Sequence, residues 1–198
     1  MKRFLVSTAF IFAAIGFAGA QARANPYDRI PKVPELSLTS ADVTDGSEMA
    51  PAQMSGVFGV PGGQDISPQL AWSKAPAGTR SFVVTMYDPD APTPSGFWHW
   101  IVVDIPATTT QLPSGAGSPD GKSLPAGAWQ LPNDARAARY IGAAPPRGDG
   151  RHRYFIAVQA LDVASLGIPK DATPAFLSFN MLGHILGRAV IVPWAEQK

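Results

Sequence analysis

Twenty prolines and nineteen glycines are spread through the 198 residues, and they divide the chain into short apolar runs. Both residue types interrupt regular elements, and the runs between them show little helical periodicity. This pattern favours many short strands joined by turns, and its spacing favours two packed sheets. We therefore expect a mainly β fold, a Greek-key sandwich of two antiparallel-rich sheets. The expected strands cover residues 35–40, 69–72, 81–88, 98–105, 152–161 and 188–193.

One helix is well marked near the C-terminus. Thr173 can cap it and Pro174 suits its first turn, so we expect a helix over residues 175–186. Apolar residues recur along it at a helical spacing that would place them on one face: Phe176, Phe179, Leu182, Ile185 and Leu186.

Three other segments have a distinctive composition. Residues 25–33 are Pro-rich and polar, and we expect an extended arm there. Residues 106–132 are rich in Gly, Pro and Ser, which predicts a long surface loop. A short helical turn is expected near residues 163–166.

The N-terminus has the layout of a secretory signal peptide. Met1-Lys2-Arg3 precedes an apolar run that ends in small residues. Ala22-Arg23-Ala24 is the preferred cleavage site, with Ala18-Gly19-Ala20 as the alternative. Gly and Ser interrupt the run, so it is a poor membrane span. We expect residues 1–24 to be removed, the protein to be exported to the periplasm or beyond, and residues 25–198 to form a single domain.

Composition limits the possible partners. Cleavage after Ala24 leaves 13 basic against 15 acidic residues, so the formal charge falls from +1 to −2. This balance argues against a nucleic-acid partner, which selects for a basic face. No basic amphipathic helix is present to hold a membrane surface, so no stable membrane anchor is expected. The chain has no cysteine, so its core must hold the fold without disulfides.

Ionisable side chains are concentrated in two short stretches. In Asp88-Pro89-Asp90-Ala91-Pro92, the prolines restrict the backbone and so present both carboxylates in set directions. A strand beginning at His99 follows, and another begins at His152. Because strand side chains alternate, His152 and Tyr154 should share a face while Arg153 points away, to the surface or to an ion pair. A histidine paired with a carboxylate favours its charged form, so Asp88 or Asp90 could charge a histidine while the other accepts from a ligand ammonium or hydroxyl.

These stretches resemble the phosphatidylethanolamine-binding proteins, in particular the bacterial members similar to Raf kinase inhibitor protein. The boxes that carry the resemblance occur in family order at residues 65–72, 88–92, 98–100 and 142–154, and the similarity spans residues 35–194. The resemblance implies a small pocket that binds phosphate-like groups and phospholipid head groups.

Carried over by motif position, the resemblance implies the following pocket residues. Asp88, His99, His152 and Tyr154 would contact the ligand, and Pro92, Ala144 and Pro146 would form walls. The Ala91–Pro92 bond would be cis, as in relatives.

Two positions depart from the family pattern. Ala144 replaces a common glycine and would reshape the wall, and Asp65 replaces an asparagine in what we expect to be a structural turn.

Simpler interpretations remain open for most of these residues. Asp88 and Asp90 would also suit a plain turn, His99 a satisfied core histidine, and Tyr154 ordinary packing. His184 is expected to be structural. A metal site is disfavoured because the chain lacks close His-x-His or His-x3-His spacing, and we expect neither metal nor another cofactor.

The leading hypothesis is an exported, non-catalytic protein that binds a small anionic ligand or a phospholipid head group. The alternative is an inhibitor or modulator of a partner protease or kinase, for which the loop over residues 106–132 would supply the contact. Catalysis is disfavoured because there is no Gly-x-Ser-x-Gly elbow and no cysteine nucleophile.

Overall fold

The computed structural model describes residues 24–198, so the predicted signal peptide, residues 1–24, lies outside the described residues except for Ala24. Residues 24–30 belong to a small N-terminal unit, and residues 31–198 form the main body. The N-terminal unit contains a 3-10 helix, η1 (Pro26–Arg29), which the Asn25 side chain caps by accepting from the Tyr27 amide. The expected extended arm is therefore wrong over this turn, because proline suits the first position of a helix as well as it suits an extended chain.

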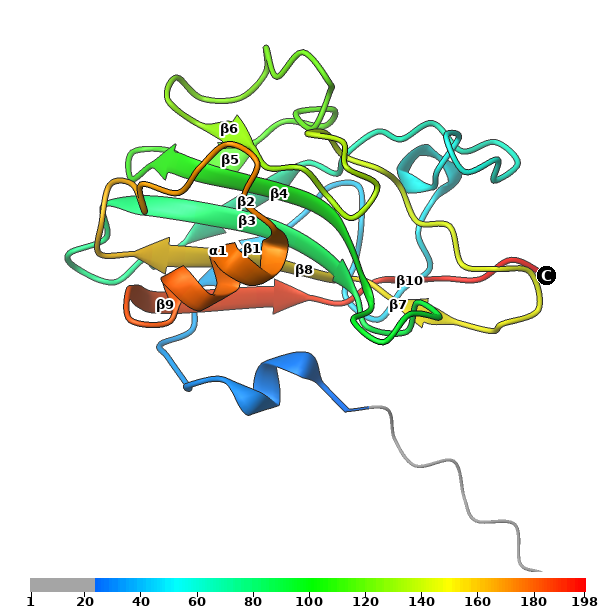
Figure 1. Cartoon of the computed structure of the whole chain (residues 1–198), viewed down its shortest axis with the longest axis horizontal. Helices are drawn as coiled ribbons and strands as arrows, with labels where there is room; N and C mark the ends of the chain where they lie inside the picture. The colour runs from blue at the N-terminus through cyan, green and yellow to red at the C-terminus, as the bar shows by residue number, and fades with distance from the viewer. Residues whose placement is uncertain (1–23) are drawn as a thin grey trace, which may run out of the picture. The chain divides into compact units, whose positions relative to one another are not determined.

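The main body is built from three antiparallel sheets (Figure 1). The largest has the order β6-β4-β3-β8-β9, with β3 at its centre. A second sheet has the order β1-β2-β5, and a third pairs β10 with β7. The bounds are β1 (Ser37–Thr39), β2 (Leu70–Ser73), β3 (Ser81–Asp88), β4 (Phe97–Pro106), β5 (Gln111–Leu112), β6 (Trp129–Gln130), β7 (His152–Arg153), β8 (Phe155–Leu161), β9 (Ile185–Ile191) and β10 (Trp194–Ala195).

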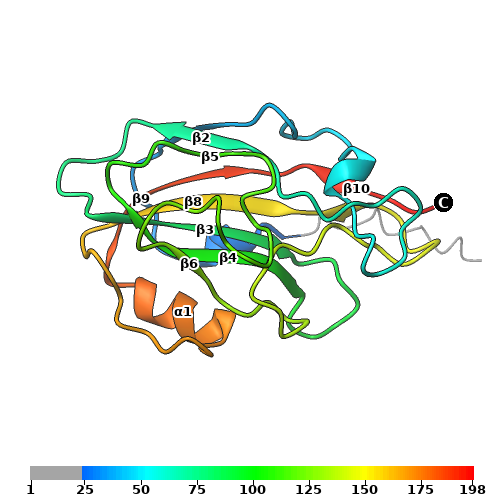
Figure 2. The same ribbon diagram turned by 90° about the horizontal axis from the view of Figure 1, so that it is seen from above.

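The main core lies between the five-stranded and the three-stranded sheets, which form separate layers in Figure 2. Leu70 and Trp72 of β2 enter it from one side, while Phe82, Trp100 and Val158 enter from the other. The Trp72 and Phe82 rings meet edge to face, with centroids 5.4 Å apart. The mainly β fold with antiparallel sheets is confirmed, while the Greek-key path stays a prediction.

A short helix covers the opposite face of the five-stranded sheet. α1 (Pro174–Met181) begins as expected, because the Thr173 hydroxyl accepts from the Phe176 amide. It ends at Met181, whereas we expected residue 186, because the chain turns at 182–184 and enters β9. No helix within residues 24–198 is long and apolar enough to cross a membrane.

The residues predicted to form the apolar face of α1 are not the ones that are buried. Leu177 and Met181 face the sheet in a second apolar cluster, whereas Phe176, Phe179 and Leu182 are exposed. Positions four residues apart lie on one side of a helix, and this short helix contacts the sheet along that side alone.

Three other local expectations also need correction. The strand expected over residues 152–161 is divided at Tyr154, because the chain leaves β10 there and joins β3. The loop expected over residues 106–132 contains β5 and β6, which pair with β2 and β4. Residues 163 and 164 form a bend, and residues 163–166 contain no helical turn.

Candidate functional site

The Asp88 carboxylate, at the end of β3, organises the turn that follows it. Its Oδ1 accepts hydrogen bonds from the backbone amides of Asp90 at 2.8 Å and Ala91 at 3.0 Å. This is the aspartate turn that the sequence allowed, and it uses one carboxylate oxygen. The other oxygen, Oδ2, lies 2.9 Å from Nδ1 of His152. Asp88 is 3% exposed, so one buried carboxylate both shapes the turn and orients a histidine.

The His152 ring lies between two carboxylates. Nδ1 faces Asp88, and Nε2 lies 3.0 Å from Oδ2 of Asp149. The His152 side chain is 1% exposed, whereas that of Asp149 is 47% exposed. A neutral imidazole has a single N–H, so both contacts are hydrogen bonds only when the ring carries two protons. Both ring nitrogens of His152 are therefore engaged by carboxylates.

His99, in β4, has the opposite electrostatic environment. Its Nδ1 lies 2.9 Å from the carbonyl oxygen of Ile141, which can only accept, so this nitrogen carries the proton. Burial lowers the pKa of His99, and the nearby Asp88 charge opposes that shift only in part. His99 is thus neutral near pH 7, with the lone pair of the ring on Nε2, and the residue lines a cavity.

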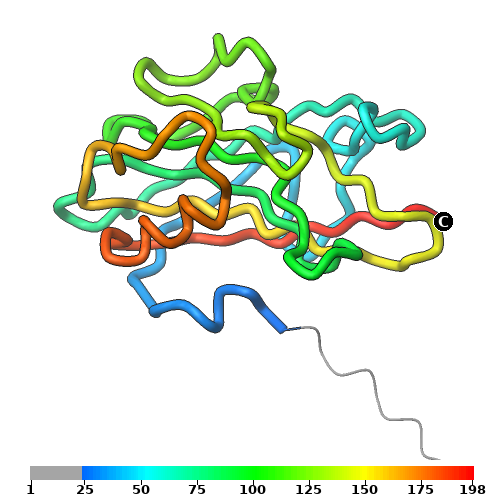
Figure 3. The backbone as a smooth tube through the Cα atoms, viewed as in Figure 1, coloured from blue at the N-terminus to red at the C-terminus, as the bar shows by residue number. Residues whose placement is uncertain are grey.

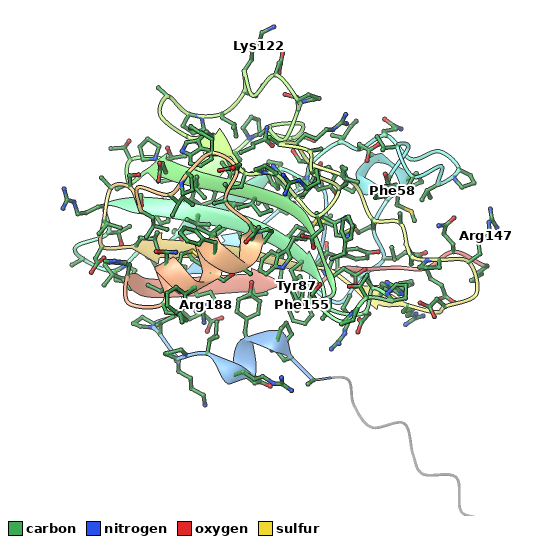
Figure 4. The ribbon with its side chains drawn as sticks, in the orientation of Figure 1. Phe58, Tyr87, Lys122, Arg147, Phe155 and Arg188 are labelled. Atoms are coloured by element: carbon green, nitrogen blue, oxygen red, sulfur yellow. The ribbon has the colours of Figure 1, made fainter. Side chains whose placement is uncertain are left out.

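The two histidines line one small cavity of about 160 Å³. This volume is well below the roughly 300–1,000 Å³ of most drug-sized ligand sites, and it suits a group about the size of a phosphate. Its walls are largely apolar, and one of the lining residues, Phe58 (labelled in Figure 4), is exposed. The lining residues are Phe58, Asp88, Ala91, Pro92, Thr93, Phe97, His99, Ala144, Pro146 and His152.

Asp90 does not line this cavity. Both of its carboxylate oxygens are held by the Arg153 guanidinium, through Nε at 2.8 Å and one terminal nitrogen at 2.9 Å. The Arg153 amide adds a third hydrogen bond at 3.0 Å. Asp90 therefore has the structural role that the sequence left open as an alternative, while its predicted ligand contact stays a prediction. Arg153 points away from the cavity into an ion pair, as alternation along the strand predicted.

Tyr154 lies behind the cavity and is absent from its lining. Its ring packs edge to face on His99, with centroids 5.3 Å apart. Its hydroxyl is buried and has no hydrogen-bond partner within residues 24–198; the Ala144 amide is near but outside hydrogen-bond geometry. Burial raises the pKa of Tyr154 far above its usual range, so the phenol stays neutral. The structure thus shows Tyr154 as a packing partner of His99.

A family model described as phosphatidylethanolamine-binding protein matches residues 39–194, a range that includes every residue of this cavity. The chain belongs to the phosphatidylethanolamine-binding protein family. The UPF0098 protein YbcL of Escherichia coli is 41% identical over 198 residues, which cover 100% of both chains. The crystal structure of YbcL matches with a TM-score of 0.80 and 42% identity, covering 83% of this chain and 99% of the solved chain.

Two further relatives extend the comparison. The UPF0098 protein YbhB of Escherichia coli is 45% identical over 156 residues, covering 79% of this chain and 97% of that protein. The putative lipoprotein LppC of Mycobacterium tuberculosis is 34% identical over 143 residues, covering 72% of this chain and 63% of that protein.

Within this family fold, Asp65 joins two cavity walls. Its Oδ2 accepts from the Val57 amide at 2.9 Å, and its Oδ1 accepts from the Gly142 amide at 2.8 Å. One carboxylate therefore positions both the loop that carries Phe58 and the segment that carries Ala144. Asp65, which replaces the asparagine common in the family, therefore has the structural role that the sequence predicted.

The Ala91–Pro92 bond, expected to be cis, is trans, since residues 24–198 contain no cis peptide.

Asp149, Phe58, Thr93 and Phe97 were missed by the sequence analysis. Asp149 had a local signal, since an acidic residue three positions before His152 can reach the ring across a glycine-containing turn. Thr93 and Phe97 immediately follow and precede predicted site segments. Phe58 had no local signal, because its place beside Phe97, with ring centroids 6.1 Å apart, depends on tertiary packing.

His184 lies outside this site. It follows α1, and its Nδ1 pairs with Asp162 at 2.8 Å, with both side chains more than 40% exposed. Among residues 24–198, no group of three or more His, Cys, Asp or Glu side chains is arranged to hold a metal ion.

The Asp90–Arg153 pair gives a stability prediction. Arg153→Ala should lower the free energy of unfolding by about 3 kcal/mol, because it leaves the nearly buried Asp90 carboxylate without its cation. Lys122→Ala is the control; this side chain is 84% exposed and pairs with Asp120 at the surface, so a change within about 0.5 kcal/mol is expected. Urea unfolding measures both variants. Equal, small losses would show that Arg153 does not support the turn.

Proposed function

We propose that this protein binds a small anionic ligand, a phosphate or a phospholipid head group, in the His99–His152 cavity. The observation that supports this most is that two histidines, one held between two carboxylates and one kept neutral by burial, line a cavity of about 160 Å³. The apolar walls reduce competition from water and so strengthen polar contacts made at the cavity base.

The two histidines would contact the anion differently. His152 would supply N–H donation from a charged ring, which gives a short and strong hydrogen bond to an oxyanion. His99 would first present an acceptor, so it would either bind a protonated phosphate oxygen or take up a proton as the ligand enters. Anion binding would therefore be coupled to protonation of His99.

We propose a binding role without catalysis. Thr93 carries the one hydroxyl side chain that lines the cavity among residues 24–198, and this hydroxyl donates to the Gly96 carbonyl. Within the part of the chain that the structure describes, neither histidine lies within hydrogen-bond distance of a hydroxyl that it could activate. Binding by this set of residues would need no cofactor.

We also propose that the protein is exported. The N-terminal sequence supports this through its charged start, apolar run and small-residue cleavage site. The similarity to LppC, which is named a putative lipoprotein, also supports export. Detection of the protein in a periplasmic extract, cleaved after Ala24, would test it.

The second candidate, inhibition or modulation of a partner protease or kinase, depends on the segment between β5 and β6. This segment projects from the body, with Lys122 near its tip in Figure 4. An inhibitor that acts through this segment would keep its activity when the cavity is altered. Loss of inhibition on deleting residues 119–127, with phosphate binding retained, would support that role.

Calorimetric titration tests the proposed anion site. Inorganic phosphate and phosphoethanolamine should bind saturably, and His152→Gln should weaken both by about tenfold or more, because one charge-assisted hydrogen bond is lost. His184→Gln is the matched control, since it removes a histidine–aspartate pair outside the cavity.

Phosphate binding that is absent in the unaltered protein would contradict the anion-site proposal. Equal losses in the His152 and His184 variants would also contradict it, because the effect would then not come from the cavity. Circular dichroism of each variant checks that the fold is kept.

The pKa of His99 gives a pH prediction. Because burial lowers this pKa, His99 is neutral in the free protein near pH 7, and an anion would favour its protonated form. Sulfate affinity should therefore rise as pH falls from about 7.5 to about 5.5, by up to about tenfold per unit for one proton taken up. Sulfate is the probe because its own charge is constant over this range.

His99→Gln should remove most of that pH dependence, whereas His184→Gln should leave it unchanged. Sulfate binding with the same slope in the His99 variant would show that His99 does not take up the proton.

A further inference from the structure

The Asp149 carboxylate is the outer partner of His152, and it differs from the inner partner in how firmly it is held. Asp88 accepts two backbone amides in addition to His152, so its position is fixed by three hydrogen bonds. Among residues 24–198, the Asp149 carboxylate has His152 as its one hydrogen-bond partner. The Asp149 side chain is also 47% exposed, so it can leave the ring without disturbing the core.

The loop that carries Asp149 is exposed but anchored on its outer side. Residues 146–149 are exposed, and the loop runs beside the C-terminal segment in Figure 3. The Gly148 amide donates to the Gln197 carbonyl at 3.0 Å, and the Gln197 side chain donates to the Pro145 carbonyl at 2.6 Å. The backbone therefore has anchors that do not depend on the Asp149 carboxylate, and rotation of that side chain alone would free Nε2 of His152.

A carboxylate oxygen 3.0 Å from this ring nitrogen makes the contact that an external anion would make. His152 lines the cavity, yet neither of its ring nitrogens is free: Asp88 holds one and Asp149 the other. An anion that is to bind this ring must replace one of the two. Of these two carboxylates, only that of Asp149 is exposed and has no other hydrogen-bond partner within residues 24–198.

We propose that Asp149 is an internal competitor of the ligand: its carboxylate occupies the anion position at Nε2 of His152 and must rotate away before an external anion binds there. This inference rests on the proposed anion site and adds how that site is kept closed. Exchange of one oxyanion for another on the same N–H keeps the number of hydrogen bonds constant, so the ligand enters without leaving a buried donor unpaired. Because Asp149 is tethered three residues away, it competes at a high effective concentration and lowers the affinity for every anion that uses this nitrogen.

Substitution of Asp149 tests this competition directly. Asp149→Ala should raise the affinity for inorganic phosphate by about tenfold or more, because the competing charge-assisted hydrogen bond is removed. Asp149→Asn should have a smaller effect in the same direction, because the carboxamide oxygen still accepts from Nε2–H but carries no charge. Calorimetric titration of the protein and both variants gives the three affinities.

The chain offers a matched control in Asp162, which also pairs with a histidine and is 44% exposed in its side chain. Asp162→Ala removes the same charge outside the cavity and should leave phosphate affinity unchanged. A comparable gain in both alanine variants would assign the effect to net charge and overturn the proposal.

The remaining outcomes separate this proposal from the one on which it rests. If the unaltered protein binds phosphate and Asp149→Ala binds it equally or more weakly, Asp149 is not a competitor and the anion site stands. A weaker variant would mean that Asp149 helps to charge His152. If neither protein binds phosphate, the anion site itself fails and this proposal fails with it.

Nuclear magnetic resonance of protein uniformly labelled with nitrogen-15 provides a second readout that needs no variant. Phosphate should shift the Nε2 signal of His152 and the Asp149 amide signal together, with a single midpoint. Saturation of the site with an unchanged Asp149 signal would overturn the proposal.

Discussion

The buried Asp88 carboxylate connects backbone geometry to side-chain chemistry in this protein. Its three hydrogen bonds fix the turn after β3 and the ring of His152 at the same time. That turn carries Pro92 and Thr93 to the cavity wall, while Asp90 within it is held by Arg153. Loss of the Asp88 carboxylate would therefore affect both the wall and the ring.

The charges around the cavity explain why two histidines are placed so differently. With His152 as a cation, the Asp88 and Asp149 carboxylates leave one net negative charge beside a neutral His99. An anion meets repulsion in this state. Rotation of Asp149 away from the ring and protonation of His99 would both make the cavity more favourable for an anion. The two proposals thus describe complementary steps by which a resting site becomes an anion site.

Sequence reasoning identified the elements that are fixed locally. The strand expected over residues 81–88 has the observed bounds of β3, and Thr173-Pro174 correctly predicted the start of α1. Of the eight predicted site residues, Asp88, Pro92, His99, Ala144, Pro146 and His152 line the cavity, because each lies in or next to a rigid turn or at a strand end.

The failures came from contacts between distant segments. Asp90 lies in the same turn as Asp88, but its role was decided by Arg153, 63 residues away. The exposed face of α1 depends on which side of the helix meets the sheet, and spacing alone does not reveal that side. The end of α1 was extended for a similar reason, since the apolar residues Ile185 and Leu186 continue the helical spacing but pair within β9.

The most direct test of this account is a crystal structure of the protein with phosphoethanolamine bound. The account predicts phosphate oxygens within hydrogen-bond distance of Nε2 of both His99 and His152, with the Asp149 carboxylate turned away from the ring. Phosphoethanolamine bound elsewhere on the molecule, with the Asp149–His152 contact intact and the cavity without it, would contradict the account.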